Sequence, residues 1–524
     1  MGDRTALAER TDDRGGSPRL SRRAFLRTAT VGGAAGAVVA SGILSAPPAG
    51  AADTSYVPAD PDLHLLRRAT YGATPGMLEG IGRQGRNVWL DRQLNPASID
   101  DRACDELIAR FFPRLKWTIP QVNRDLVDFS WDLMFELGAA TIARAAWSKR
   151  QLFEVMVDFW SNLLNVTNPS DNVWDNRHDY DRLVIRKHAL GRYEDMLIAS
   201  AKHPAMLRYL NNAESHKWSP NENYGRELLE LHTVGVEAGY TEQHMRHSAL
   251  IMTGFTVNWD DGTFVYKPSW HHTGPVTVMD FTRANGAADG QDMAIAYLRY
   301  LANHPVTARR IATKLCERFV SDTAQPALVD RLAQLYLDNG TAIAPVLRAL
   351  FRSPEFADAI GEKVRRPTED VMATIRILGI KPGDSKAGLR DLYWMIESLG
   401  HAPLAWSQPD GYPDFADAWR SAGGLVGRWN ATMALAAHWW PDKIVRPPLR
   451  DLLPRKLPAT HGKLVDVLSR RLVFRTLAPA HRSAVLEFLD VNDATPLAKD
   501  SAAVKWRFAS LVALILGSPY HQIR

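Results

Sequence analysis

The stretch from Pro220 to Gly235, PNENYGRELLELHTVG, gathers side chains that could do acid–base or metal chemistry. Wound as a helix at about 100° per residue, it places Asn223, Glu227 and Glu230 on one face. Two carboxylates three residues apart repel each other, and if they are buried they need a cation or a shared proton between them. Three interpretations stay open: a solvated face, a buried polar network with Arg226, or an acid–base or metal site.

The other polar residues of this stretch complete the candidate site. Arg226 can pair with Glu222 at an i, i+4 spacing, and Asn221 is placed to help cap the helix start. Proline suits a first helical position, so we expect the helix to begin at Pro220, after a serine cap. His232 falls roughly opposite the edge that carries the carboxylates. We expect the leucines to hold the helix to a core while the carboxylates line a buried pocket.

A segment with strand-like alternation follows, TVNWDDGTFVYKPSWHHTGPVTVMDF, and it predicts one small hairpin or extended flap over residues 256–282. If the flap folds over the polar helix, His272 approaches the two carboxylates. Glu227, Glu230 and His272 would then be candidate ligands of a divalent metal, which needs three or four such side chains. Glu227, Glu230 and Arg226 are the candidate catalytic residues.

Outside the flap the apolar periodicity is helical almost throughout, so the predicted fold class is mainly α, a large multi-helix body with one small β excursion. Several helices end just before a His-Pro or Ser-Pro pair, which indicates a helix junction with proline at the first position of the next helix. These pairs are His203-Pro204, His304-Pro305, Ser353-Pro354 and Ser518-Pro519.

Composition excludes several classes of function. The chain has 524 residues, 46% of them hydrophobic, and a net charge of +5. Much of that positive excess lies among the arginines of the first 28 residues, so the body is close to neutral and gives no reason to expect nucleic-acid binding. The usual motifs of zincins, α/β-hydrolases and nucleotide-binding proteins do not occur.

The N-terminus has the features of a twin-arginine export signal. Arg22 and Arg23 precede a weakly apolar, glycine- and alanine-rich run, and the segment ends in Ala49-Gly50-Ala51, which suits signal peptidase. We therefore assign residues 1–51 to the signal and residues 52–60 to a linker. The mature protein is expected in the periplasm, the cell wall or outside the cell, without a transmembrane anchor.

The two cysteines, Cys104 and Cys316, lie far apart and in no metal-binding motif. Two buried thiols are the favoured interpretation, and one disulfide between them stays open.

Two further groups of residues could bind a ligand. The segment WSQPDGYPDFADAW combines four aromatic residues with Asp410 and Asp414, which would suit a sugar; alternatively its aromatic side chains pack inward. The segment NRHDYDR, with His178 and Asp179, is either a metal-binding cluster or the polar start of a helix.

Several blocks of the sequence follow the order found in the domain-of-unknown-function 1800 family. They are HLLRRATYGATPGMLE, FWSNLLNV, NENYGRELLELHTVGVEAGYT, LIMTGFTV, HPVTARRIATKLCERFVSD, LFRSPEF and PDGYP. The chain resembles this family from residue 61 to about residue 520. The resemblance implies an exported bacterial protein, often encoded beside a member of the domain-of-unknown-function 1501 family, which is therefore a candidate partner. It implies no particular reaction.

This chain departs from many members of the family at positions that could bind metal. Ser161 and Leu163 stand where those members have histidines, and Thr273 stands where they have an aspartate after the flap histidine. Two functions therefore stay open. One is an exported envelope protein with a polar or metal-binding pocket of hydrolase type, and the other is a non-catalytic envelope or assembly factor that acts with a partner protein.

Overall fold

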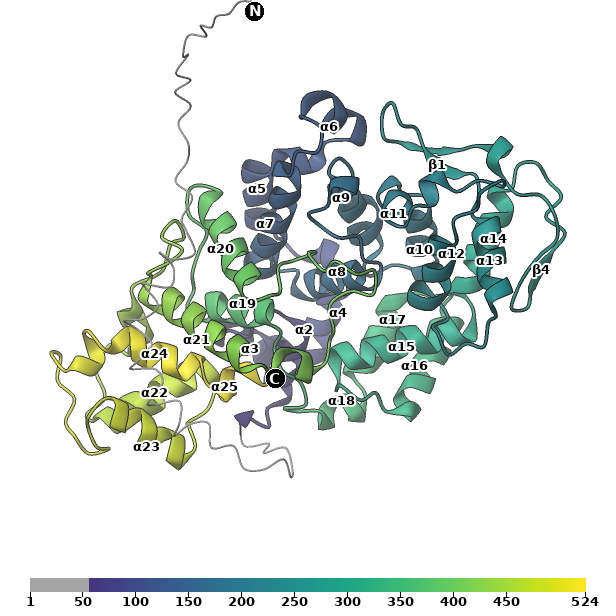
Figure 1. Cartoon of the computed structure of the whole chain (residues 1–524). Helices are drawn as coiled ribbons and strands as arrows, with labels where there is room; N and C mark the ends of the chain where they lie inside the picture. The colour runs from purple at the N-terminus through teal and green to yellow at the C-terminus, as the bar shows by residue number, and fades with distance from the viewer. Residues whose placement is uncertain (1–55) are drawn as a thin grey trace, which may run out of the picture.

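Helices form nearly all of the regular structure in a computed structural model that describes residues 56–524 (Figure 1). The predicted twin-arginine signal, residues 1–51, lies outside the described residues. Among the residues that are described, no helix is both long and apolar enough to cross a membrane. The predicted fold class, mainly α with a small β excursion, is confirmed.

The first half of the chain builds the body that carries the polar helix. Its helices are α2 (Pro61–Ala69), α3 (Pro75–Gln84), α4 (Arg86–Gln93), α5 (Arg102–Phe111), α6 (Ile119–Asp125), α7 (Asp132–Trp147), α8 (Gln151–Leu163), α9 (Arg177–Tyr180), α10 (Tyr193–Ala201), α11 (Pro204–Tyr209), α12 (Glu222–Glu227) and α13 (Glu242–Ile251). Two π-helical turns, Asp181–Arg186 and Leu228–His232, extend α9 and α12.

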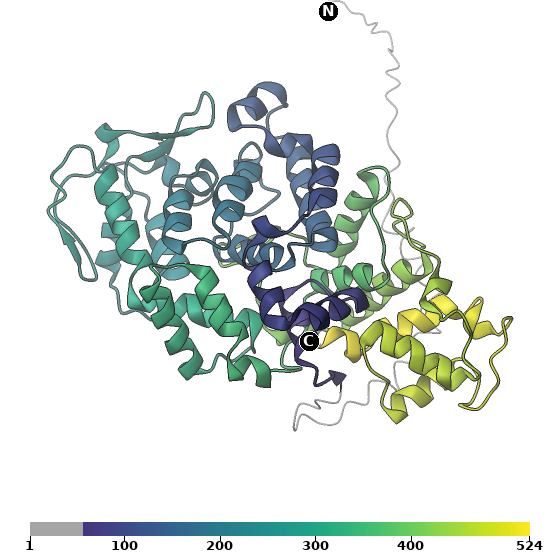
Figure 2. The same cartoon turned by 180° about the vertical axis from the view of Figure 1, so that it is seen from behind.

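The second half adds two further groups of helices. The first group is α14 (Gln291–Ala302), α15 (Pro305–Phe319), α16 (Pro326–Asp338), α17 (Ile343–Phe351) and α18 (Pro354–Asp358). Helix α14 lies beside the β hairpins, and α15 to α18 lie below it in Figure 1. The helices α19 (Pro367–Ile377), α20 (Ala387–Ser398), α21 (Ala422–Ala437), α22 (His461–Val473), α23 (Pro479–Phe488), α24 (Phe508–Leu516) and α25 (Pro519–Gln522) complete the opposite side. Seen from behind, α2 to α4 cross the middle, between these two sides (Figure 2).

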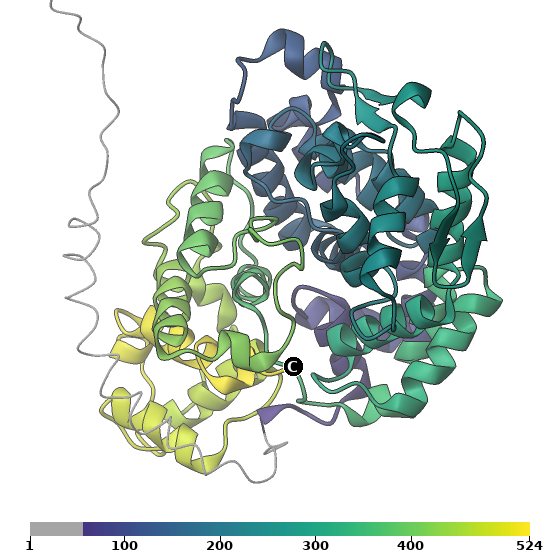
Figure 3. The ribbon, with the colours of Figure 1, turned by 45° about the vertical axis from the view of Figure 1, so that its right-hand side comes forward.

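The flap is two short antiparallel hairpins, where the sequence predicted one hairpin or an extended flap. In the first, β1 (Phe255–Val257) pairs with β2 (Phe264–Tyr266), and in the second, β3 (Val276–Val278) pairs with β4 (Phe281–Arg283). Gly262, at a φ of +75°, provides the left-handed turn residue of the first hairpin. Both hairpins lie at one end of the molecule, far from α22 and α23 (Figures 1 and 3).

The predicted helix junctions are confirmed, because Pro204, Pro305, Pro354 and Pro519 each begin a helix. At two of these junctions the preceding histidine is the cap. The Nδ1 atoms of His203 and His304 accept hydrogen bonds from the N–H groups of Ala205 and Val306, each at 3.2 Å. Both histidine rings therefore cap the helix that follows them.

The central core includes α7, α8 and α19. All of α19 except Arg376 is buried, and it packs against both α7 and α21. Gly72, in the segment between α2 and α3, lies against α19 so closely that a Cβ there would be 2.6 Å from the Cα of Ala373. The favoured interpretation of the cysteines is confirmed, because Cys104 and Cys316 are both free and buried.

Candidate functional site

The polar stretch forms α12 and continues as the π-helical turn Leu228–His232. The helix begins two residues later than predicted, because Asn221 is the cap and Pro220 precedes it. The Asn221 Oδ1 accepts from the N–H of Asn223 at 3.0 Å, as expected of a capping residue, and the Asn221 N–H donates to Ser215 Oγ at 3.0 Å. π-Helical turns are rare and are frequent at functional sites.

One side of this stretch is fixed firmly to the core. Gly225 lies so close to α13 that a Cβ would be 2.6 Å from the N of Ala249, so only glycine permits this approach. His232 is buried, and burial followed by the charge of Arg310 lowers its pKa to about 3. Its carbonyl accepts a short hydrogen bond from the Tyr193 hydroxyl. His232 is therefore a neutral core residue, away from the carboxylates.

The carboxylates on the other side are half-buried, where the sequence predicted a buried pocket. Burial raises the pKa of Glu227, and the negative charges of Glu230 and Asp410 raise it further. Burial and Glu230 also raise the pKa of Tyr240, to about 12, and its hydroxyl hydrogen-bonds Glu230. We call Glu227, Glu230 and Asp410 the acidic patch.

Arg226 does not form the predicted pair with Glu222. Its Nη1 lies 4.0 Å from Oε1 of Glu230, and its Nη2 lies 3.6 Å from Oε1 of Glu242 on α13. Arg226 thus pairs with acids, as expected, but not with Glu222, because it can reach either one turn back or one turn forward and α13 supplies a second acid on the forward side. Glu222 is half-buried at the start of α12, and the Asn223 Nδ2 donates to the carbonyl of Leu210 at 3.3 Å.

The flap does not bring His272 to the acidic patch. The charged neighbours that affect the pKa of His272 are His271 and His247, whereas those of Glu227 are Glu230, Arg226 and Asp410. Helix α13 packs against α12 with one part of its surface and against β3 with another. The flap therefore reaches α13, where the Thr277 N–H donates to His247 Nδ1 at 2.8 Å.

The predicted metal ligands Glu227, Glu230 and His272 are thus not assembled. Within residues 56–524 there is no group of three or more His, Cys, Asp or Glu side chains that could hold a metal ion. The cluster in NRHDYDR is the polar helix start: the His178 Nε2 lies 3.0 Å from the carbonyl of Trp117, and Asp179 pairs with Arg182.

The aromatic loop, residues 406–419, lies beside the acidic patch and is attached to α8 and to the segment that follows it. The Asn165 Nδ2 donates to the carbonyls of Trp406 and Gln408, at 3.0 and 2.6 Å. The rings of Trp406 and Tyr412 lie 5.0 Å apart, and Tyr412 also contacts His401. The aromatic side chains thus pack partly inward, while Asp410 stays exposed and accepts from Trp406 Nε1 at 2.8 Å.

Beneath this loop is a small cavity that the sequence analysis missed. Its volume of about 20 Å³ suits one water molecule, and its lining includes Tyr71, Asp158, Ser161, Asn162 and His401. A polar stripe along α8 and just beyond its end supplies much of this lining: Asp158, Ser161 and Asn162 on the helix, then Asn165, follow one another at spacings of three, one and three. That helical spacing of polar residues in an otherwise apolar helix was the available signal.

Leu163, the other position where many members of the family have a histidine, is half-buried and does not line the cavity. Thr273 lies in the flap.

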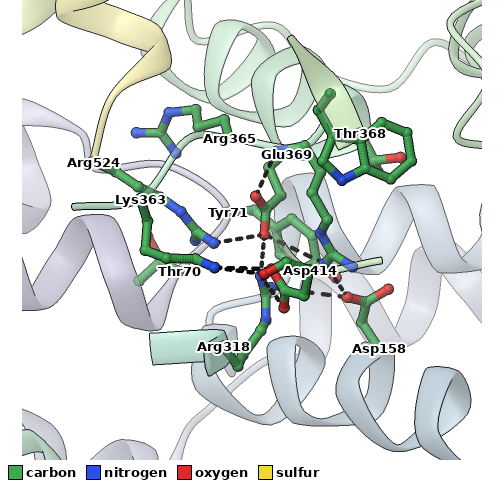
Figure 4. A network of polar contacts seen from close by, with 12 residues as sticks. Thr70, Tyr71, Asp158, Arg318, Lys363, Arg365, Thr368, Glu369, Asp414 and Arg524 are labelled. Atoms are coloured by element: carbon green, nitrogen blue, oxygen red, sulfur yellow. Dashed lines mark hydrogen bonds and ion pairs between the residues drawn. The ribbon is translucent and has the colours of Figure 1, made fainter. Parts of the chain in front are cut away.

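A buried network of charges borders the cavity through Asp158 (Figure 4). Glu369 is its centre: its Oε1 lies 2.5 Å from Arg318 Nη1, 3.3 Å from Arg524 Nη2 and 3.4 Å from Arg366 Nη2. The other members are Asp158, Asp322, Lys363 and Asp414. These three arginines hold the pKa of Glu369 well below its usual range despite burial, which acts in the opposite direction.

The network removes Asp414 from the predicted sugar-binding residues. Its Oδ2 lies 3.6 Å from Arg318 Nη1, and its Oδ1 lies 3.5 Å from Lys363 Nζ. Asp414 therefore anchors the end of the aromatic loop to the core, and Asp410 is the loop carboxylate that faces outward.

Comparison with known families identifies what the chain is similar to. The family model described as "Protein of unknown function (DUF1800)" matches residues 64–523. The chain belongs to this family. For this DUF1800 member, no curated protein and no solved structure gives a match. The matched range includes the polar helix, the aromatic loop and every residue of the buried charge network except Arg524.

Proposed function

We propose that this DUF1800 protein is exported by the twin-arginine route and acts in the cell envelope as a hydrolase-type enzyme on a hydroxyl-rich polymer. The observation that carries the proposal is the acidic patch. Glu227 is half-buried beside Glu230 and Asp410, and burial and these two charges raise its pKa. A carboxyl group with a raised pKa next to an ionised one is the usual arrangement of a general acid and its partner.

The surroundings of the patch suit such a substrate. Trp406 and Tyr412 offer half-buried ring faces next to an exposed carboxylate, Asp410. Rings that are apolar on the face and bordered by hydrogen-bond acceptors bind sugar rings by stacking and through their hydroxyl groups. The proposal uses carboxylates alone, since no three-ligand group for a metal is present among the described residues.

The test is hydrolysis of isolated envelope polysaccharides, measured as new reducing ends, by the mature protein. Glu227→Gln is expected to lower the rate by at least about 100-fold, the usual contribution of a general acid or base. Glu242→Gln is the matched control, since Glu242 also pairs with Arg226 but is 78% exposed and outside the patch. An unchanged rate in Glu227→Gln would remove Glu227 from the mechanism.

Export is tested separately. Replacement of Arg22 and Arg23 by lysine should leave the protein in the cytoplasm, because twin-arginine signals depend on the arginine pair. Export of the double variant at the normal level would contradict this part of the proposal.

One observation favours the second function, a non-catalytic assembly factor. Val127, Phe129 and Trp131 are exposed between α6 and α7, and Trp259 is exposed in the first hairpin. The Asn123 Nδ2 donates to the carbonyl of Asp261 at 3.0 Å, which joins α6 to that hairpin. Neighbouring exposed apolar side chains often mark a protein-binding surface.

The candidate partner is the companion protein of the domain-of-unknown-function 1501 family. Co-purification of the two proteins that is lost in Trp259→Ser, but kept in Trp506→Ser, would favour this function. Trp506 is the control because it is also exposed but lies between α23 and α24, outside the proposed binding surface.

A further inference from the structure

A buried arginine, Arg68, lies beside the buried charge network. Ion pairs join four basic residues to four acids: Arg318, Lys363, Arg366 and Arg524 to Asp158, Asp322, Glu369 and Asp414. Arg68, in α2, adds a fifth positive charge and is fully buried. Within the described part of the chain it forms no ion pair, and Nη2 donates to the carbonyl of Ala359 at 2.5 Å.

The charge of Arg68 is close enough to that of another buried arginine to be repelled by it. The charged group that acts on it most strongly is another cation, Arg524, ahead of the acids Glu362, Asp322 and Glu369. Arg524 in turn lies next to Arg318, which also repels it. Two buried guanidinium groups therefore repel each other, and a third acts on the second.

Several N–H groups of these arginines have no acceptor within the described residues. They are Nε and Nη1 of Arg68, Nε of Arg524 and Nε of Arg318. Leaving buried donors without acceptors is costly, and the cost is larger for charged groups. A guanidinium also keeps its proton in proteins, so Arg68 does not escape this cost by becoming neutral.

We propose that a small inorganic anion binds between Arg68 and Arg524 and completes the buried network. A negative charge at this place would offset the charge of Arg68, whose strongest acidic neighbour, Glu362, is exposed. An anion also accepts hydrogen bonds from several N–H groups at once. A halide and a small oxyanion share this chemistry. The site is separate from the acidic patch, where the charge has the opposite sign.

The anion has a structural consequence, because the network joins distant parts of the chain. Arg68 belongs to α2, Arg318 to α15, Glu369 to α19, and Arg524 follows α25. Figure 4 shows side chains from several elements meeting at Glu369. An anion that binds only the folded protein should therefore stabilise it in proportion to the logarithm of its concentration.

The first experiment is thermal unfolding of the mature protein at constant ionic strength. Fluoride is the reference salt, and it is replaced stepwise by chloride, bromide or phosphate. We expect Tm to rise by a few degrees with one of these anions, and the effective anion tells a halide from an oxyanion. Equal Tm values with all four anions would overturn the proposal.

Arg68→Met provides the matched variant. It removes the fifth charge and leaves four basic residues facing four acids, so the protein should fold and its Tm should no longer depend on the anion. Arg102→Met, at an 82% exposed arginine, should keep the dependence of the wild type. An Arg68→Met protein with the wild-type anion dependence would contradict the assignment.

A crystallographic measurement does not depend on any variant. Crystals of the wild-type protein grown in bromide should show an anomalous difference peak between the Arg68 and Arg524 guanidinium groups, if the site accepts a halide. If phosphate is the stabilising anion, the corresponding feature is tetrahedral density at the same place. Ordinary water at that position in both crystals would overturn the proposal.

Discussion

Asn162 holds Tyr412 through both atoms of its side-chain amide. Its Oδ1 accepts from the Tyr412 N–H at 2.6 Å, and its Nδ2 donates to the Tyr412 carbonyl at 2.7 Å. This two-point contact fixes the aromatic loop on α8, above the cavity and beside Glu227. A residue in the polar stripe of a core helix thus decides where the outward-facing loop lies.

Asn162→Ala should loosen the aromatic loop without unfolding the protein. It removes two hydrogen bonds, each contributing about 1 kcal/mol. Hydrogen–deuterium exchange should rise in residues 406–414. Asn339→Ala is the control, because the Asn339 side chain bonds only the carbonyl of Leu335 in its own helix and is exposed. Equal exchange in this loop for both variants would show that Asn162 does not hold it.

Gly411→Ala should be more damaging than Gly400→Ala, although both glycines have nearly the same φ, +75° and +76°. A side chain in this conformation costs about 1–2 kcal/mol. At Gly400 no atom lies within 4 Å of the new Cβ, but at Gly411 it would be 2.2 Å from the carbonyl O of Asn162. The free energy of unfolding, measured in urea, should fall by at least about 3 kcal/mol in Gly411→Ala.

Glu227→Gln should stabilise the protein at pH 7. The pKa of Glu227 is raised in the folded state by burial and by Glu230, so ionising this group favours unfolding. This loss of folding stability is absent below the ordinary glutamate pKa of about 4.3, and it becomes complete as pH rises through the raised pKa of the folded protein. Tm of the variant should therefore exceed that of the wild type at pH 7 and match it near pH 4. A lower Tm at pH 7 would contradict this sign.

His232→Gln should weaken the loss of stability in acid. Burial and Arg310 lower the pKa of His232 to about 3, so between about pH 6.5 and 3 the unfolded chain binds a proton that the folded protein does not. Stability then falls by about 1.4 kcal/mol per pH unit as pH decreases through this window.

The His232→Gln variant should lack the contribution of His232 to this pH dependence, as measured by urea unfolding at pH 7, 6 and 5. His64, whose pKa burial and Arg68 also lower to about 3, should keep the remaining slope above zero. A slope equal to that of the wild type would show that His232 is not buried in its neutral form.

Glu369→Gln should cost more stability than any substitution in a surface ion pair. It leaves Arg318, Arg366 and Arg524 buried without their shared carboxylate, and breaking a buried pair in this way costs about 3–5 kcal/mol. Asp100→Asn is the comparison, since its pair with Arg102 is exposed and screened by solvent, so its loss should change stability little. Equal urea midpoints for the two variants would show that the network does not hold these segments together.

Local features of the sequence were enough to predict most of the secondary structure. Helical periodicity, threonine and proline at helix starts and the alternating flap each act within a few residues, so they can be seen without tertiary structure. Thr74 accepts from the Met77 N–H and Pro75 begins α3, as their order in the sequence suggests. The capping role of Asn221 could be seen in the same way.

Tertiary packing decided which polar residues lie together. The sequence alone determined that this is a mainly α-helical member of its family, with two carboxylates on one face of a helix. It could not show that α13 keeps His272 from Glu227, or that Asp410, far along the chain, lies near that carboxylate. It also could not show that residues of α15, α19 and the C-terminal segment surround Glu369, because such contacts depend on how distant segments pack, which local pattern does not encode.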